Sequence, residues 1–319
     1  MTLKVHFDNV CFNAPTGPNV FGVRLAKRLF EMGHEVVLSA HGADVSLVFI
    51  EPTGAPLAPI VVQRLDGIWT KPSDFNTKNF MIKSLYDDAD AVVWQSEFDK
   101  TTIQRLWGTK NGVVIHNGIE IALVKSITIP ALAEMRATYK RIYVCSASWH
   151  GQKRLEANVG FFRHLKQKCH SSCLIVIGDH PDYRATGTDV FYAGHVTPEV
   201  YTQIYFAADW MLHLAYMDHC PNVVVEALAQ GTPVACVDSG GTKELIGAYG
   251  IVLNETKHSD EFEFIDYDNP PELDVTRFNE LPVRSELDYS TIADIDIKNT
   301  AKKYVEMFES LCTPSAAGV

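Results

Sequence analysis

Apolar and polar positions alternate with two different periods near the start of the chain. Residues 3–12 form a mostly apolar run, residues 20–32 repeat apolar side chains at intervals of three and four, and residues 35–39 are again apolar. This order predicts a buried strand, a helix that packs by one face, and a second strand. Gly33 stands where the helix should end, because glycine adopts the left-handed conformation of a helix C-terminus without strain. The pattern predicts a β-loop-α-β unit.

The same alternation continues in two series. The first predicts strands at 45–50, 59–65, 90–96 and 112–119, with helices at 76–89 and 96–107. The second predicts strands at 141–149, 172–179, 189–194, 209–215 and 233–238, with helices at 156–168 and 197–208. Strands that alternate with crossover helices are typical of parallel sheets. The predicted fold class is α/β, with two doubly wound domains, residues 1–125 and 126–296, followed by a helical segment at 297–319.

The charge balance excludes some partners. The chain has 319 residues, of which 46% are hydrophobic, and a formal net charge of -11. This acidic balance leaves no broad positive surface for nucleic acid or an anionic membrane. No uninterrupted apolar run reaches the roughly 18 residues of a transmembrane helix, and the acidic start is unlike a signal peptide. We expect a cytoplasmic protein with no nucleic-acid partner and no transmembrane segment.

The cysteines indicate neither disulfides nor a metal site. There are seven, scattered from Cys11 to Cys312, and such an odd, dispersed set does not form a disulfide framework in a chain of this length. Cys169 and Cys173 are close in sequence, but no second ligand pair follows at a zinc-binding spacing. We expect no metal site.

The stretch from Asp218 to Leu245 carries two acids on either side of a predicted helix start. Pro221 suits the first position of a helix, where its missing N–H costs nothing, and Gly231 suits the position after a helix of about ten residues. On a helical wheel Glu226 falls away from the valine and leucine side chains. The pattern therefore predicts a Glu226 side chain outside the core.

The start of this helix is a candidate anion site. The first N–H groups of a helix, here those of Asn222 and Val223, have no partners within it, and the helix dipole favours negative charge there. A nucleotide sugar with its diphosphate at this end could direct ribose hydroxyls to Glu226 and its sugar to Asp218. His219 is a candidate hydrogen-bond donor to sugar or phosphate. The alternative is an ordinary helix with an exposed Glu and an acid that stabilises its dipole.

Two cations follow the first strand of the second domain. Lys153 and Arg154 come after a strand and a glycine turn, at the sheet edge where α/β proteins commonly bind ligands. A lysine there can neutralise a phosphate. Taken alone, each residue fits a solvated surface cation better. The loop that contains Gly17 allows close approach of a ligand, but it matches neither G-x-G-x-x-G nor the phosphate-loop pattern.

These segments together resemble the retaining glycosyltransferases of family 4, which have the GT-B fold. The resemblance is carried by GPNVFGVRLAKRLFEMGHEVV at 17–37, VIHNGI at 114–119, SASWHGQKRL at 146–155 and PNVVVEALAQGTPVACVDSGGTKELI at 221–246. It implies two Rossmann-like doubly wound domains that face each other across a cleft. Residues 1–125 would form the acceptor side and residues 126–296 would bind the nucleotide sugar, with the helix in 297–319 crossing back to the first domain.

Two motifs of that family match this chain in part. In its E-x7-E motif the second acid, which holds the ribose, corresponds to Glu226, whereas the first, near the donor sugar, is replaced by the shorter Asp218. The family also places an Arg and a Lys five residues apart on the diphosphate. Lys153 matches the Lys, but Ser148 occupies the Arg position. We expect Arg154 or the helix N-terminus to supply the missing charge.

The resemblance also implies further site residues. Those expected to line the donor are Gly17, Gly194, Val196 and Gly241, and the polar candidates on the acceptor side are Arg64, Asp66 and His116. The implied activity is metal-independent transfer of a sugar, with retention, from a nucleoside-diphosphate sugar to a hydroxyl of a glycan or other acceptor. No cofactor is expected, because Lys153 and the helix amides would stabilise charge on the leaving diphosphate, and that phosphate would take the acceptor proton.

Two alternatives remain open. Ser148 and Asp218 depart from the family motifs and motivate a catalytically degenerate GT-B module that binds a nucleotide sugar or glycan. A UDP-sugar 2-epimerase is a further alternative, although the acid and base residues that it needs are not evident in the sequence.

Overall fold

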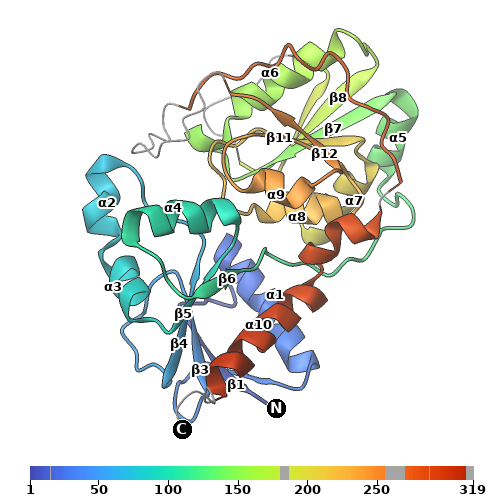
Figure 1. The fold of residues 1–319 in the computed structure, drawn as a ribbon. Coiled ribbons are helices and arrows are strands. Elements are labelled where there is room, and N and C mark those ends of the chain that lie inside the picture. The colour runs from blue at the N-terminus through green and yellow to red at the C-terminus, as the bar shows by residue number, and fades with distance from the viewer. Residues whose placement is uncertain (15, 180–186, 256–269, 287, 314–319) are drawn as a thin grey trace. The chain divides into compact units, whose positions relative to one another are not determined.

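The chain forms two compact units. A computed structural model describes residues 1–14, 16–179, 187–255, 270–286 and 288–313. Unit 1 comprises Met1–Glu120 and Asp294–Val319, and unit 2 comprises Ile121–Ala293. Figure 1 draws the chain from blue at the N-terminus to red at the C-terminus, and the segments of unit 1 carry the two ends of this scale. The chain therefore leaves unit 1 after Glu120 and returns to it at Asp294.

Unit 1 contains a parallel six-stranded sheet in the order β2-β1-β3-β4-β5-β6. Its strands are β1 Lys4–Asp8, β2 Glu35–Val37, β3 Val45–Phe49, β4 Ile60–Leu65, β5 Ala91–Trp94 and β6 Gly112–Val114. Its helices are α1 Gly17–Glu31, α2 Pro72–Lys78, α3 Phe80–Asp88, α4 Glu97–Trp107 and α10 Ile297–Cys312. Every residue of β3 is buried, as is typical of a parallel strand covered on both faces.

The ends of β1 and α1 test the apolar pattern. The prediction of a first strand over residues 3–12 was wrong at its C-terminal end, because β1 stops at Asp8. Asn9 has φ 60°, and its Nδ2 donates a hydrogen bond to the carbonyl oxygen of Phe49 at 2.8 Å. The predicted end of α1 is confirmed, since Gly33 adopts φ 88° just beyond it. The apolar pattern does not reveal that an asparagine adopts the left-handed conformation, whereas a glycine is itself a signal for the end of a helix.

The last helix belongs to the core of unit 1. Tyr304 and Phe308 of α10 are fully buried, and the ring of Tyr304 lies 6.2 Å from that of Phe21 in α1. In Figure 1 the red α10 crosses the blue α1. The segments that leave and re-enter the unit pair with each other, because Ile119 N–H donates to the Ile295 carbonyl and Ile297 N–H donates to the Ile119 carbonyl. Unit 1 is thus completed by residues from both ends of the chain.

Unit 2 contains a second parallel six-stranded sheet, in the order β12-β11-β10-β7-β8-β9. Its strands are β7 Arg141–Ser146, β8 Ser172–Ile177, β9 Val190–Gly194, β10 Trp210–His213, β11 Val234–Val237 and β12 Gly250–Leu253. Its helices are α5 Pro130–Thr138, the 3-10 helix η1 Gly151–Lys153, α6 Leu155–Lys166, α7 Pro198–Ala207, α8 Asn222–Ala229 and α9 Thr242–Ile246. A second 3-10 helix, η2 Tyr289–Ile295, precedes α10. The two sheets confirm the predicted α/β class.

The segment that enters unit 2 is held by two glutamine side chains. Gln230 accepts from the Val124 N–H at 3.0 Å and donates to the Ala122 carbonyl at 3.0 Å. Gln203 accepts from the Thr128 N–H at 2.9 Å. These bonds satisfy backbone groups that have no sheet or helix partner, so the start of unit 2 packs against the rest of that unit.

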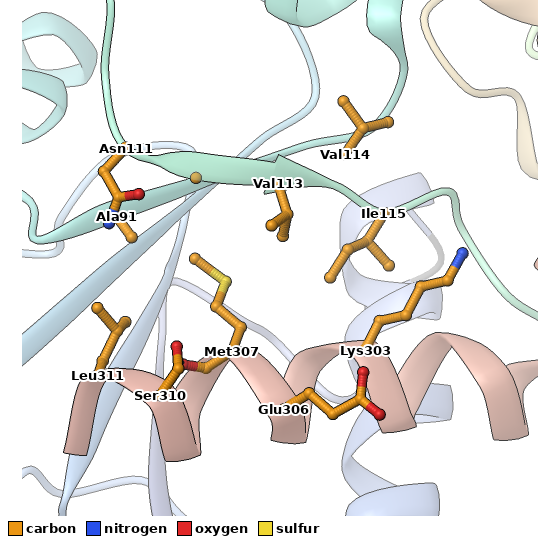
Figure 2. Close-up of a pocket in the computed structure, with 11 residues that line it drawn as sticks. Ala91, Asn111, Val113, Val114, Ile115, Lys303, Glu306, Met307, Ser310 and Leu311 are labelled. Atoms are coloured by element: carbon orange, nitrogen blue, oxygen red, sulfur yellow. The ribbon is translucent and has the colours of Figure 1, made fainter. Parts of the chain in front are cut away.

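A groove of about 440 Å³ lies in unit 1 beside the edge strand β6. In Figure 2 Val113 and Ile115 point toward α10, whose Met307 rises toward the strand, and Lys303 and Glu306 lie at one end. None of the site residues expected from the sequence lines this groove. It is therefore a feature separate from the candidate site described below.

Candidate functional site

Lys153 and Asp218 meet at the carboxyl edge of the unit 2 sheet. Lys153 ends η1, which follows β7, and Asp218 lies in the loop after β10. Because β7 and β10 are neighbouring parallel strands, the loops that follow them leave the same edge of the sheet. The Lys153 Nζ and Asp218 Oδ2 atoms are 2.5 Å apart, and their side chains are 20% and 12% exposed. The structure thus joins two charges that the sequence had assigned to separate tasks.

His213 is a third member of this cluster, and sequence reasoning missed it. It is the last residue of β10 and is buried, and its Nε2 lies 3.1 Å from the same Oδ2 of Asp218. Burial alone would raise the pKa of Asp218, but the charge of Lys153 and the hydrogen bond with His213 hold this pKa well below its ordinary value of 3.8. Asp218 is therefore a carboxylate fixed by two neighbours. The available signal was a polar residue at the end of an apolar strand.

The side chain of Arg154 is buried inside unit 2. Its side chain is 4% exposed, and its Nη1 lies 2.6 Å from Oε1 of Glu255, which is 1% exposed. Its Nη2 donates to the Pro271 carbonyl at 2.8 Å. Burial raises the pKa of Glu255, although a hydrogen bond with Ser239 and the nearby Arg154 charge act in the opposite direction. The sequence predicted that Arg154 or the helix N-terminus supplies charge to a diphosphate, and in this structure the guanidinium of Arg154 is committed to a buried ion pair.

The same ion pair anchors the backbone that carries Lys153. Arg154 has φ 50° and ψ 54°, a left-handed conformation that turns the chain from η1 into α6. Gln152 next to Lys153 exchanges two bonds with Tyr216, since the Tyr216 N–H donates to the Gln152 carbonyl and the Gln152 Nε2 donates to the Tyr216 carbonyl, each at 2.9 Å. The two site loops are therefore joined by hydrogen bonds next to the Lys153–Asp218 pair.

A glycine turn supports the backbone of Asp218. The Gly241 N–H donates to the Asp218 carbonyl at 2.8 Å. A Cβ atom on Gly240 would lie 2.5 Å from that carbonyl oxygen and 2.8 Å from the Asp218 nitrogen, and Gly240 has φ +83°. Only glycine fits both this spacing and this conformation. Gly241 therefore holds Asp218 by a backbone hydrogen bond, and the neighbouring Gly240 cannot be replaced by a residue with a side chain without a clash.

Helix α8 begins one residue later than predicted and is shorter. Pro221 is its N-cap and not its first residue, and the helix runs for eight residues to Ala229. Asn222 and Val223 in its first turn are half-buried. In α8, as in any helix, the N–H groups of the first turn have no acceptor within the helix, so this end remains suited to an anion.

Glu226 is buried, which corrects the interpretation from the helical wheel. Its exposed fraction is 7%, and its charge contributes, after burial, to raising the pKa of buried Tyr205. The wheel assumed a helix that packs by one face. Helix α8 instead packs against α7, α9, β10 and β11, so most of its surface is covered. Glu226 therefore lies inside unit 2 with only a small exposed area.

The other expected donor residues of unit 2 occupy the same sheet edge. Ser148 is exposed in the loop after β7, and His219 is half-buried directly after Asp218. Gly194 ends β9 with φ 66°, and its carbonyl accepts from the Gly178 N–H at 2.9 Å. Val196 follows two residues later and is half-buried. These positions share an edge of the sheet because the strands before them are parallel.

The expected residues of unit 1 differ in accessibility. Gly17 is the exposed first residue of α1, Asp66 follows β4 and is half-buried, and His116 is half-buried after β6. Arg64 is only 1% exposed, and its Nη2 donates to Oδ1 of Asn117 at 2.6 Å. The predicted acceptor-side role of Arg64 is therefore not supported by its position, because its guanidinium lies inside the unit.

Comparisons with known proteins agree with this architecture. Residues 139–264 match the family model described as glycosyl transferases group 1. This range contains Lys153 in η1, Asp218 in the loop after β10 and Glu226 in α8. No curated protein sequence matches the chain.

Solved structures with the same fold cover both units. HepE from Anabaena, in complex with UDP-glucose, has a TM-score of 0.68 at 17% identity and covers 97% of this chain and 100% of its own. A glycosyltransferase from Rickettsia africae has a TM-score of 0.67 at 12% identity, covering 98% and 100%. WaaG, a glycosyltransferase involved in lipopolysaccharide biosynthesis, has a TM-score of 0.60 at 14% identity, covering 98% and 100%. The fold of this protein is that of GT-B glycosyltransferase structures.

Within the described ranges no helix is both long and apolar enough to cross a membrane. Among the residues whose placement is described, no group of three or more His, Cys, Asp and Glu side chains is arranged to hold a metal ion.

Proposed function

We propose that the protein transfers a sugar, with retention, from a nucleoside-diphosphate sugar to a hydroxyl of a glycan or glycosylated acceptor. The observation that carries this proposal is the Lys153–Asp218 ion pair, 2.5 Å long, at the carboxyl edge of a parallel sheet beside the N-terminus of α8. The fold, and the family match of residues 139–264, support the same class of reaction.

Each group has a chemical task in this proposal. Lys153 and the first N–H groups of α8 stabilise the charge that grows on the leaving diphosphate. Asp218 accepts a hydrogen bond from the transferred sugar, and Glu226 accepts from the ribose hydroxyls. The leaving phosphate takes the proton of the attacking hydroxyl, so the proposed mechanism needs neither a protein nucleophile nor a metal ion.

A panel of nucleoside-diphosphate sugars tests the proposal. We expect one donor, with UDP-glucose the first to be tried, to raise the thermal unfolding midpoint and to be hydrolysed slowly without an acceptor. Lys153→Ala and Glu226→Ala should each abolish hydrolysis. Lys166→Ala is the matched control, because Lys166 forms a 2.6 Å ion pair with Asp189 near the opposite edge of the sheet. If wild-type protein neither binds nor hydrolyses any donor, the proposal is wrong.

A second candidate function is a GT-B module that binds its ligand without turnover. The observation that favours it is the commitment of Arg154 to Glu255, which removes one of the two cations expected at the diphosphate. Ser148 carries no charge to replace it. Calorimetry that detects tight donor binding, in protein that forms no product with any acceptor, would support this candidate, and measurable transfer would exclude it.

A further inference from the structure

We propose that His213 is a positioning residue that holds Asp218 in place while Lys153 turns to the donor diphosphate. The inference rests on the proposed function, because it assigns Lys153 to a phosphate. Its basis is that Lys153 Nζ and His213 Nε2 both contact the same oxygen, Oδ2 of Asp218, at 2.5 and 3.1 Å. Oδ1 is the oxygen that neither contact uses.

The two neighbours of Asp218 differ in freedom of movement. Lys153 has a long side chain with 20% exposure, and it projects from a short 3-10 turn. His213 is 4% exposed and sits in a central strand, paired in register with Cys236 of β11. An imidazole has only two rotatable side-chain bonds, whereas lysine has four and loses more entropy on being fixed. Lys153 is therefore the neighbour that can move, and His213 is the one that stays.

The charges near the Lys153–Asp218 pair favour this division, in which Lys153 binds the diphosphate and His213 holds Asp218. Arg154 is buried against Glu255, so Lys153 is the cation at this turn that reaches an exposed surface. If a diphosphate draws Lys153 away, Asp218 loses its closest neighbour and would be free to rotate. The hydrogen bond from His213 keeps the carboxylate oriented, with Oδ1 directed to a sugar hydroxyl. The short side chain of Asp218 suits this arrangement, because an added methylene would have to fit between two contacts in a buried site.

Variants at position 213 separate the effect of the hydrogen-bond donor of His213 from the effect of its size. Glutamine places its Nε2 near the position of the histidine Nε2 and can still donate to Asp218. Asparagine reaches only as far as the histidine Nδ1 and leaves Asp218 without this donor. His213→Gln and His213→Asn are therefore the matched pair, and both remain polar if His213→Leu fails to fold.

The first test needs no donor substrate. In a Lys153→Met background, a double-mutant cycle with His213→Asn and Asp218→Ala measures the coupling of His213 and Asp218 in urea unfolding. We expect a coupling of about tenfold in the unfolding equilibrium constant, the size of one hydrogen bond to a charged group. Coupling that vanishes without Lys153 would overturn the inference, whatever the protein does with nucleotide sugars.

The second test measures kcat and KM for UDP-glucose hydrolysis and the Kd for UDP. His213→Asn should lower kcat about tenfold while the Kd for UDP stays within about twofold of wild type, because UDP lacks the transferred glucose that Asp218 would hold. His213→Gln should recover most of kcat. Equal losses in the two variants, or a weakened UDP complex in both, would overturn the positioning role. Wild-type protein that neither binds nor hydrolyses UDP-glucose would count against the proposed function for this donor, and the unfolding cycle would then decide the role of His213 alone.

Discussion

Arg154 and Glu255 form a buried ion pair, with 2.6 Å between Nη1 and Oε1, directly behind the turn that presents Lys153. The exposed fractions of the two side chains are 4% and 1%. A pair in this setting fixes geometry more than it adds stability, because both charges have lost their hydration. The loop that carries Lys153 is thus attached to Glu255, two residues after β12, and β12 lies at the opposite end of the sheet order from β9.

Removing one partner of that pair should be costly. Arg154→Met leaves Glu255 as an unpaired buried carboxyl, and we expect a loss of about 3–5 kcal/mol in the free energy of unfolding measured in urea. The double variant Arg154→Met with Glu255→Leu should recover most of this loss. Arg28→Met, which removes an exposed pair with Glu31, is the control and should cost less than about 1 kcal/mol. A double variant as unstable as the single one would contradict the expectation.

Alanine variants at two glycines with positive φ distinguish backbone strain from loss of the support that Gly240 gives to Asp218. Gly240→Ala places a Cβ 2.5 Å from the Asp218 carbonyl oxygen at φ +83°, whereas Gly247→Ala, at φ +47°, meets no heavy atom within 4 Å. Each variant should lose about 1–3 kcal/mol of stability from its positive φ, and Gly240→Ala should lose more, because its Cβ would meet backbone atoms of Asp218. Only Gly240→Ala should also abolish donor hydrolysis, because Asp218 must move. Equal activity in the two variants, measured below their unfolding temperatures, would show that the position of Asp218 does not matter.

Much of the fold could be predicted from the sequence, because each element carried its own signal. The burial of all of β3 follows from its continuous apolar run, and the end of α1 follows from Gly33. The end of β1 was missed because Asn9 adopts a left-handed conformation that depends on its bond to Phe49, a residue far along the chain. Local periodicity reports local preferences and cannot report that contact.

Sequence reasoning proposed Lys153, Asp218 and Glu226 but missed His213, and it did not give the contacts that these side chains make. Lys153, Asp218 and Glu226 were found from residue type and position, yet their partners depend on the packing of distant segments. Glu226 is buried because four elements surround α8, and Arg154 is buried because Glu255 lies a hundred residues later in sequence but adjacent in space. No helical wheel or spacing rule contains this information.

The stability of the folded protein should respond to pH through Asp218. Its pKa is lowered in the folded state, so it binds fewer protons there than in the unfolded chain near pH 3.8. The stabilisation is therefore fully present above the unfolded pKa of 3.8 and is lost as the pH falls below it. The difference in unfolding free energy between wild type and Asp218→Asn should shrink as the pH is lowered through this range. Asp274→Asn is the control, because the Asp274 pKa is also lowered but the carboxyl is exposed. A difference that stays constant down to pH 3 would contradict the assignment.

Arg64 should affect the stability of unit 1 and not the recognition of an acceptor. Its guanidinium lies 4.4 Å from the ring centroid of Phe21 and 5.1 Å from that of Phe49, and its Nη2 donates to Asn117, in the segment where the chain leaves the unit. Arg64→Met keeps much of the bulk but leaves Asn117 without this donor, so we expect a loss of about 1–3 kcal/mol in urea unfolding.

The activity of the Arg64 variant distinguishes these two roles. At a temperature where Arg64→Met remains folded, donor hydrolysis and transfer should stay within about twofold of wild type, since the side chain has almost no exposed surface with which to touch a substrate. Lys83→Met, which removes an exposed ion pair with Asp87, is the control for loss of a positive charge in the same unit. A tenfold fall in transfer with unchanged unfolding would instead place Arg64 against the acceptor, and would require the buried guanidinium to become accessible when the acceptor binds.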